Sequence, residues 1–171
     1  EFFYKFVFFR TFFMILFFAA AVIPPLLIAY YVYQQDKYDK EPRSLLIKSF
    51  LFGCVSVVPA LILEIILDAN LFSNLFLYVF IGIALVEEGV KFFFLRGYMY
   101  QKEEFNEPMD GIVYGVAVSL GFATYENYDY VYRLALEWKE HDITPQDVAI
   151  WRSYSAVPMH GLNGCLMGFY L

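Results

Sequence analysis

The chain alternates between long apolar runs and short polar segments. The apolar runs cover about residues 8–33, 44–67, 75–98, 110–133 and 146–171. Each is close to the roughly 20 mostly apolar residues that a helix needs to cross a bilayer. Because backbone polar groups in lipid must pair within their own segment, each run predicts a helix. The pattern therefore predicts an all-α fold, a polytopic integral membrane helical bundle with about five transmembrane helices.

The polar segments between the runs are expected outside the membrane, as the loops 33–43, 99–109 and 134–149. They are too short to separate two domains, so residues 1–171 are expected to form a single membrane-embedded domain. Pro24-Pro25 predicts a kink in the first helix. The sequence stops at Leu171 inside an apolar run, which leaves further helices beyond it open.

Positive charges set the expected orientation. The loop 33–43 carries three of them, Lys37, Lys40 and Arg43. The turn 68–74 has neither Lys nor Arg. Because cytoplasmic loops are enriched in these residues, we expect loops 33–43 and 99–109 in the cytoplasm and 134–149 outside. Basic residues around 134–149 count against this orientation.

Composition points to the same environment. The residues are 60% hydrophobic and 22% aromatic, and 20 of them are Phe. That is too apolar for an ordinary soluble domain, so part of the surface is expected to face the lipid bilayer. The net charge of −6 argues against nucleic acid as a partner, because binding nucleic acid needs a basic surface.

The third run contains charged residues where lipid would make them costly. Glu87, Glu88 and Lys91 interrupt it, although residues 69–86 carry no Asp, Glu, Lys or Arg. Glu87 and Lys91 can pair as i, i+4 neighbours. Glu88 is rotated by about 100° from Glu87 and is expected to lack this partner. Ionisable residues inside membranes mark functional sites by default, so we interpret these three as a site.

The fourth and fifth runs supply more polar groups. Glu126 and Asn127 lie in the fourth run, and His160 follows Pro158 in the fifth. Proline removes a backbone donor and opens the helix near the histidine, which suggests a polar cavity. A rise of about 1.5 Å per residue places the third-run glutamates and His160 near mid-membrane. Glu126 is expected to be shallower, unless its helix continues past Tyr132.

Carboxylates beside an imidazole can do several kinds of chemistry. A buried glutamate can act as a general base that activates water. The set Glu88, Glu126 and His160 could instead hold a zinc ion, although zinc sites of this kind usually carry more His. Intramembrane Glu, Lys and His can also relay protons, so a proton or ion transporter is an alternative. No inverted repeat is visible to support a transporter.

Small residues form stripes on the last two helices. Gly111 and Gly115 form GxxxG, while Gly161, Gly164 and Gly168 recur at i, i+3 and i+7. Such stripes allow helices to approach closely in membranes, so we interpret all five glycines as packing positions.

Four motifs occur in order along these segments: YQQDKYDKEPRSLLIKSFLFG, EEGVK, NEPMDGIVYGVAVSLGFATYEN and RSYSAVPMHGLNGCLMGFYL. Together they resemble the PrsW family of membrane-embedded proteases, which is related to the CAAX-prenyl endopeptidase and bacteriocin-processing membrane proteases. The resemblance covers roughly residues 30–171. EEGVK fits the family's EExxK, and the last motif fits its Arg-to-His segment.

The resemblance implies a role for each motif residue. Glu87 and Glu88 would activate the attacking water. Glu126 would stand where the CAAX-protease pattern has its first histidine, and His160 would match the second. The same resemblance implies supporting positions for Lys91, Asn127, Asp110 and Arg152.

Three supporting positions carry more specific expectations. The CAAX group often places an Asn four residues after the second histidine, but Gly164 stands there, with Asn163 beside it. Asn127 is then a substitute candidate for binding the oxyanion. Asp110 is expected to cap the fourth helix. Arg152 is expected to pair with a carboxylate or with a lipid phosphate.

The function that the resemblance implies is intramembrane proteolysis in a bacterial cell membrane. The substrate would be a membrane protein, with site-1 cleavage of an anti-sigma-factor-like protein as the family activity. A glutamate-type and a zinc-dependent mechanism both stay open. A second alternative is a non-catalytic scaffold subunit of a protease complex, because some members of this superfamily serve that role.

Overall fold

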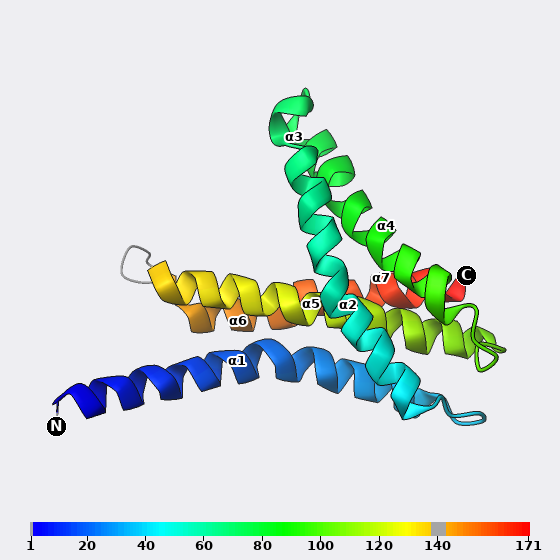
Figure 1. The fold of residues 1–171 in the computed structure, drawn as a ribbon, viewed down its shortest axis with the longest axis horizontal. Coiled ribbons are helices and arrows are strands. Elements are labelled where there is room, and N and C mark those ends of the chain that lie inside the picture. The colour runs from blue at the N-terminus through cyan, green and yellow to red at the C-terminus, as the bar shows by residue number, and fades with distance from the viewer. Residues whose placement is uncertain (1, 138–142) are drawn as a thin grey trace.

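The computed structural model describes residues 2–137 and 143–171, and this part of the chain is built from helices (Figure 1). Helices α1 (Phe2–Gln35) and α2 (Arg43–Ile66) coincide with the first two predicted runs. α1 extends past both predicted ends and continues through its two prolines as one curved helix (Figure 1). The first two predicted helices are therefore confirmed as helices, with the loop between them shortened.

The third predicted helix is continuous from residue 75 to 99 but changes its winding. A short turn, η1 (Ala69–Leu71), precedes it. Its segments are α3 (Leu75–Leu77), the π-helical η2 (Tyr78–Ala84), α4 (Leu85–Phe94) and the π-helical η3 (Leu95–Met99). π-helical segments are rare and frequently lie at functional sites. Here they lie on both sides of α4, the segment that carries the charged residues.

The last part of the chain differs from the prediction in two ways. α5 (Pro108–Glu137) is longer than expected, and the predicted fifth helix is two helices, α6 (Pro145–Tyr154) and α7 (Ala156–Phe169). The break falls at Ser155, whose φ of −117° and ψ of −77° depart from helical values. Pro158 explains the break, because it has no N–H for the Tyr154 carbonyl and its ring crowds that carbonyl.

α5 is the central helix of the bundle. It packs against α7, α2 and α1, while α4 packs mainly against α2. Figure 1 shows α1, α5, α6 and α7 running roughly side by side, with the hairpin of α2 and α3–α4 rising away from them. Buried side chains such as Tyr114, Leu120 and Phe122 line the α5 contacts.

The α5–α7 contact depends on glycine. A Cβ atom at Gly115 would lie 2.3 Å from the Gly164 carbonyl oxygen, and one at Gly168 would lie 1.8 Å from the Gly111 carbonyl oxygen. Any larger residue would therefore force the two backbones apart. The predicted packing role is confirmed for these four glycines. Gly161 differs, because its nearest neighbour would be the Leu120 side chain at an ordinary 3.6 Å.

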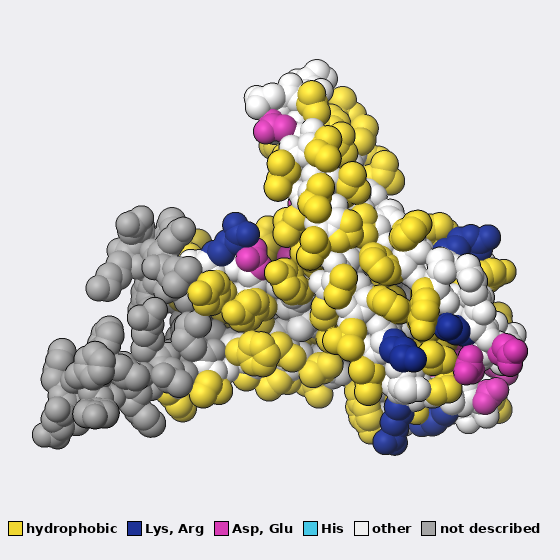
Figure 2. All heavy atoms as spheres, in the orientation of Figure 1, with side chains coloured by type: hydrophobic (Ala, Val, Ile, Leu, Met, Phe, Trp, Pro, Cys, Tyr) yellow, Lys and Arg dark blue, Asp and Glu magenta, His cyan; other side chains and the backbone are white. Residues whose placement is uncertain are grey.

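Apolar side chains cover much of the visible surface. Figure 2 shows them over the projecting α2–α4 hairpin, with charged side chains gathered at the end of the molecule that holds the loops 36–42 and 100–107. Within the described residues, α2 is the one helix that is long and apolar enough by itself to cross a membrane. The expectation of about five membrane helices goes beyond that finding.

Candidate functional site

Lys91 is the buried cation of a charged cluster on α4. Its side chain is fully buried, and its Nζ lies 2.9 Å from Glu88 Oε1 and 3.5 Å from Glu87 Oε2. The expectation that Glu88 lacks this partner is therefore wrong. Lys91 reaches back one turn to both glutamates, and the i, i+3 contact is the closer one. Removing both glutamates would leave the buried Lys91 ammonium without a counter-charge.

His160 joins this cluster from α7. Its Nδ1 lies 3.0 Å from Lys91 Nζ, and its Nε2 lies 3.0 Å from Glu126 Oε2 on α5. The ring also contacts Phe122, which lies under the Lys91 ammonium at 4.1 Å from its ring centroid. The histidine therefore connects charged groups on three helices.

These contacts define the tautomer of His160. An ammonium group has three donors and no acceptor, so His160 Nδ1 must accept the hydrogen bond from Lys91. Nε2 then carries the proton and donates to the Glu126 carboxylate. A histidine held at both nitrogens has a fixed ring orientation, which is what proton transfer at a defined position requires.

Glu126 is held from the other side by α6. Its Oε2 accepts a hydrogen bond from Arg152 Nη2 at 2.7 Å, and Arg152 Nε donates to Asn127 Oδ1 at 2.5 Å. The guanidinium also stacks over Tyr130. Glu126 reaches the site because α5 does continue past Tyr132, as the depth argument required. Arg152 was expected to pair with a carboxylate or with a lipid phosphate, and in the structure it pairs with the carboxylate of Glu126.

Two further residues face this site, and the sequence reasoning did not assign them to it. Asn163 Nδ2 donates to Glu88 Oε1 at 3.0 Å. The sequence feature that could have identified Asn163 is its i, i+3 spacing from His160, which places both residues on one face of a helix. Glu64, near the end of α2, interacts electrostatically with Glu87, Glu126 and Lys91. Glu64 could have been identified from the sequence because it is an acidic residue near the end of an otherwise apolar run.

Asn127 and Asp110 lie away from the reactive groups. Asn127 is buried, with its Nδ2 directed at the Ala21 carbonyl at 3.5 Å and its Oδ1 at Arg152. Asp110 is 16 residues before Glu126 on α5, about 24 Å along the axis. Its Oδ2 accepts from the backbone N–H groups of Asn106 at 2.7 Å and Glu107 at 2.6 Å, so Asp110 caps the start of α5 from the third helical position and not, as expected, from the residue before the helix.

A second group of carboxylates lies at the Asp110 end of the molecule. Tyr114 donates a hydrogen bond to Glu41, and the backbone N–H of Glu41 donates to Asp36. Burial raises the pKa of Glu41 to about 8, and the neighbouring Asp110 and Asp36 carboxylates add to the rise, although the Tyr114 hydrogen bond opposes it. Glu41 therefore binds a proton at neutral pH in the loop between α1 and α2.

The main site is only partly buried. The side chains of Glu87, Glu126 and His160 are 14%, 20% and 12% exposed, and that of Glu88 is 28% exposed. Glu88 is also asymmetric: Oε1 binds Lys91 and Asn163, whereas Oε2 is buried and has no partner among the described residues. An unsatisfied buried carboxylate oxygen is rare in proteins, and it makes Oε2 the available acceptor of the site.

The same groups are suited to a divalent metal. Among the described residues, ligand atoms of Glu87, Glu88 and His160 lie within 4.8 Å of one another. Two carboxylates and an imidazole are a donor set that zinc accepts, and Glu88 Oε2 is a free ligand atom. The residues therefore fit a metal, which would compete with the Lys91 ammonium. The structure groups Glu87 rather than Glu126 with the other two predicted ligands.

The carboxylates, the imidazole and the buried Lys91 ammonium lie among apolar helices, and such groups can activate water or relay protons. The chain belongs to the PrsW family: the family model described as "PrsW family intramembrane metalloprotease" matches residues 41–171. This match confirms the family resemblance of the sequence motifs and places all the clustered residues inside the matched region.

Curated relatives agree with the family assignment. Protease PrsW of Geobacillus kaustophilus is 38% identical over 141 residues, which is 82% of this chain and 58% of the relative. Protease PrsW of Bacillus subtilis is 37% identical over 82% of this chain and 61% of its own length. Protease PrsW of Clostridioides difficile is 35% identical over 83% of this chain and 59% of its own length. The chain thus spans about three fifths of these relatives. No solved structure matches it.

Proposed function

We propose that this chain is the membrane-embedded peptidase unit of a bacterial intramembrane protease, with about five membrane-spanning helical segments. The observation that carries the proposal is the continuous network Glu88–Lys91–His160–Glu126, which joins three helices beside an unpartnered carboxylate oxygen. Such a network is costly to bury, and proteolysis of membrane proteins gives it a purpose. The relatives named Protease PrsW support the same activity.

Glu88 is the general base in this proposal. Its free Oε2 can take a proton from the attacking water, while Lys91 and Asn163 hold Oε1 and so fix the carboxylate plane. Glu87 shares the ammonium of Lys91 with Glu88 and so helps to hold that ammonium in place. Glu87 and Glu88 thereby take different roles, although both are expected from the family motif.

His160 and Glu126 supply the proton that the leaving amine takes up. The Nε2–H of His160 faces Glu126, and Arg152 keeps that carboxylate in place. An imidazole oriented in this way can pass a proton toward the leaving amine. Asn163 carries a second N–H beside the one that Glu88 binds, which suits it to the oxyanion. Asn163 would thus serve the oxyanion-binding role that the family resemblance assigns to an Asn at position 164.

A zinc ion fits the same proposal as a cofactor. Glu87, Glu88 and His160 would hold it, while Glu126, the other ligand expected from the sequence, would stay on the second nitrogen of His160. When bound, it would supply Lewis-acid polarisation and lower the pKa of a water molecule to about 7. Glu126 and Arg152 would orient His160 in either mechanism, because their contacts do not depend on the ion.

The substrate class follows from the position of the site among apolar helices. We propose a membrane protein, an anti-sigma-factor-like protein by analogy with the family activity. The bond to be cut must leave its helix, because helical amides are hydrogen-bonded internally. Substrates with a helix-breaking residue near the cleavage position should be cleaved faster.

The test is cleavage of a single-span substrate by protein reconstituted in liposomes. Glu88→Gln and His160→Gln should abolish cleavage, whereas Glu103→Gln, an exposed loop carboxylate, should not. Metal content measured on the same samples assigns the mechanism: zinc that is lost in both site variants indicates a metalloprotease, and an active metal-free preparation indicates a glutamate type.

The same preparation tests the alternatives. Proton uptake into the liposomes without cleavage would favour a transporter, since the buried Glu, Lys and His are also groups that relay protons. Inactivity of the purified chain together with a stable complex with a second protease would favour a scaffold subunit. Full cleavage by both Glu88→Gln and His160→Gln would reject the proposed site.

A further inference from the structure

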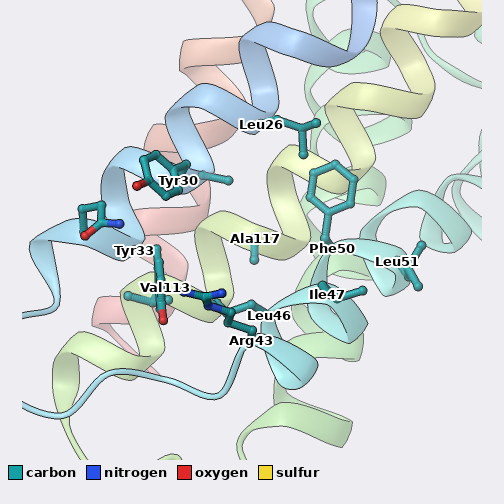
Figure 3. Close-up of a pocket in the computed structure, with 12 residues that line it drawn as sticks. Leu26, Tyr30, Tyr33, Arg43, Leu46, Ile47, Phe50, Leu51, Val113 and Ala117 are labelled. Carbon is teal, nitrogen blue, oxygen red and sulfur yellow. The ribbon is translucent and has the colours of Figure 1, made fainter.

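An amphipathic groove lies between α1 and α2, on the surface of α5. It has a volume of about 610 Å³, within the range of small-molecule sites. Figure 3 shows side chains of all three helices pointing into it. None of its lining residues belongs to the charged cluster described above. The groove is therefore separate from that cluster.

The polarity of the groove changes from one end to the other. Arg43, Gln34 and Tyr33 lie at the end where α1 finishes and α2 begins. Apolar side chains line the rest of it: Leu26, Ala29, Leu46, Ile47, Phe50, Leu51, Val113 and Ala117. Figure 3 shows Leu26 and Phe50 at the opposite side of the groove from Tyr33 and Arg43. This gradient matches a molecule with a polar head and an apolar tail.

Two basic side chains lie near the polar end: Arg43 lines the groove, and Lys40 contacts the lining residues Gln34 and Tyr33. Arg43 is exposed and has no carboxylate or hydrogen-bond partner in the described part of the chain. Lys40 Nζ donates to Gln34 Oε1 at 2.9 Å and lies 5.0 Å from the centroid of the Tyr33 ring. Two acids of the same loop are buried and bonded elsewhere: Glu41 accepts from Tyr114, and Asp36 accepts from the backbone N–H of Glu41. A guanidinium and an ammonium at one groove end complement a phosphate.

With the helices embedded in a bilayer, the polar end would lie at the level of the lipid headgroups. The loop 36–42 leaves the helices there, and charged side chains gather around it (Figure 2). Tyr30 and Tyr33 line the same end, and tyrosines concentrate at membrane interfaces. The charge count of this loop predicts the cytoplasmic side, whose leaflet is rich in anionic lipids.

From this geometry we propose that the groove binds an anionic phospholipid. Its phosphate contacts Arg43 and Lys40, and an acyl chain lies along Leu46, Ile47 and Phe50. The bound lipid fills the opening between α1 and α2 and thereby stabilises their packing against α5. The proposal requires membrane embedding but not proteolytic activity, so its test is a binding measurement.

The test titrates the purified protein with dioleoyl-phosphatidylglycerol and, separately, dioleoyl-phosphatidylcholine, with bound lipid counted by native mass spectrometry. The protein should bind the anionic lipid about fivefold more tightly, the effect of roughly one basic residue at a membrane surface. Arg43→Gln should remove that preference. The matched control is Lys48→Gln, which removes an exposed positive charge of α2 outside the groove and should keep it.

Two further results complete the test. Leu51→Trp places a larger side chain at an exposed position of the groove and should weaken binding of both lipids. A photo-crosslinker at Ile47 in cell membranes should give a lipid adduct. Equal affinity for the two lipids, an unchanged preference in Arg43→Gln, or a protein adduct from Ile47 such as a substrate helix would overturn the proposal.

Discussion

His160 Nδ1 lies 3.0 Å from Lys91 Nζ, although the two residues are 69 positions apart in the chain. Together with the hydrogen bond from Asn163 to Glu88, this contact ties α7 directly to α4. Because the ammonium can only donate, it also decides which imidazole nitrogen carries the proton. One interaction therefore links the packing of the helices to the chemistry of the site.

Lys91 should be essential to stability as well as to activity. Lys91→Met leaves two partly buried carboxylates without their cation, and we expect the free energy of unfolding to fall by about 1–3 kcal/mol. Denaturant unfolding of the purified protein measures this loss. Lys48→Met, at an exposed position on α2, should change it by about 0.5 kcal/mol or less. Equal losses in the two variants would contradict the buried-pair interpretation.

Arg152 is expected to act through Glu126 as a positioning residue. Arg152→Gln removes the contact to that carboxylate, so kcat should fall roughly 10–100-fold with little change in KM. Arg152→Lys should recover part of the loss, because an ammonium can still pair with Glu126. The control is Arg133→Gln, an exposed residue paired with Asp129 four residues before it. A matching loss in this control would argue for a general charge effect.

Much of the site was predictable from the sequence for a physical reason. Charged residues in apolar helices are rare, so Glu87, Glu88 and Lys91 were conspicuous, and His160 lay at a matching depth. Their closest partners were not predictable. Whether Lys91 approaches Glu88 or Glu87 depends on side-chain rotamers, and the contact of Asn163 depends on the rotation of α7.

The fold shows the same division between local and tertiary information. Apolar runs predicted where the helices lie, but not the break at Ser155 or the continuation of α5 to Glu137. Pro158 marked an opened backbone three residues away from the actual break. The π-helical segments beside α4 had no signal in the apolar pattern, because hydropathy does not distinguish a wider helical turn.

Close packing of α5 on α7 gives a prediction with an internal control. Gly115→Ala would place a Cβ atom 2.3 Å from the Gly164 carbonyl oxygen, whereas at Gly161 the nearest atom would be a side-chain carbon at 3.6 Å. We expect Gly115→Ala to destabilise the protein by about 1–3 kcal/mol and Gly161→Ala to be nearly neutral. Thermal unfolding of both variants tests this, and equal melting temperatures would contradict the close contact.

The proton on Glu41 makes the stability of the fold depend on pH. Its pKa is raised to about 8, mainly by burial, from 4.5 for an ordinary glutamate. The folded state therefore binds more protons than the unfolded state between these values, and stability must fall as pH rises from about 4.5 to 8. The melting temperature should accordingly be higher at pH 5.5 than at pH 8.5.

Glu41→Gln isolates this effect. The amide keeps an acceptor for Tyr114 and a donor for Asp110, but it cannot ionise, so the difference in melting temperature between pH 5.5 and pH 8.5 should shrink. Glu104→Gln, in the exposed part of the neighbouring loop, should leave the difference intact. If Glu41→Gln keeps the full pH dependence, another group binds the proton, and the buried carboxylates at this end of α5 are ionised in the folded protein.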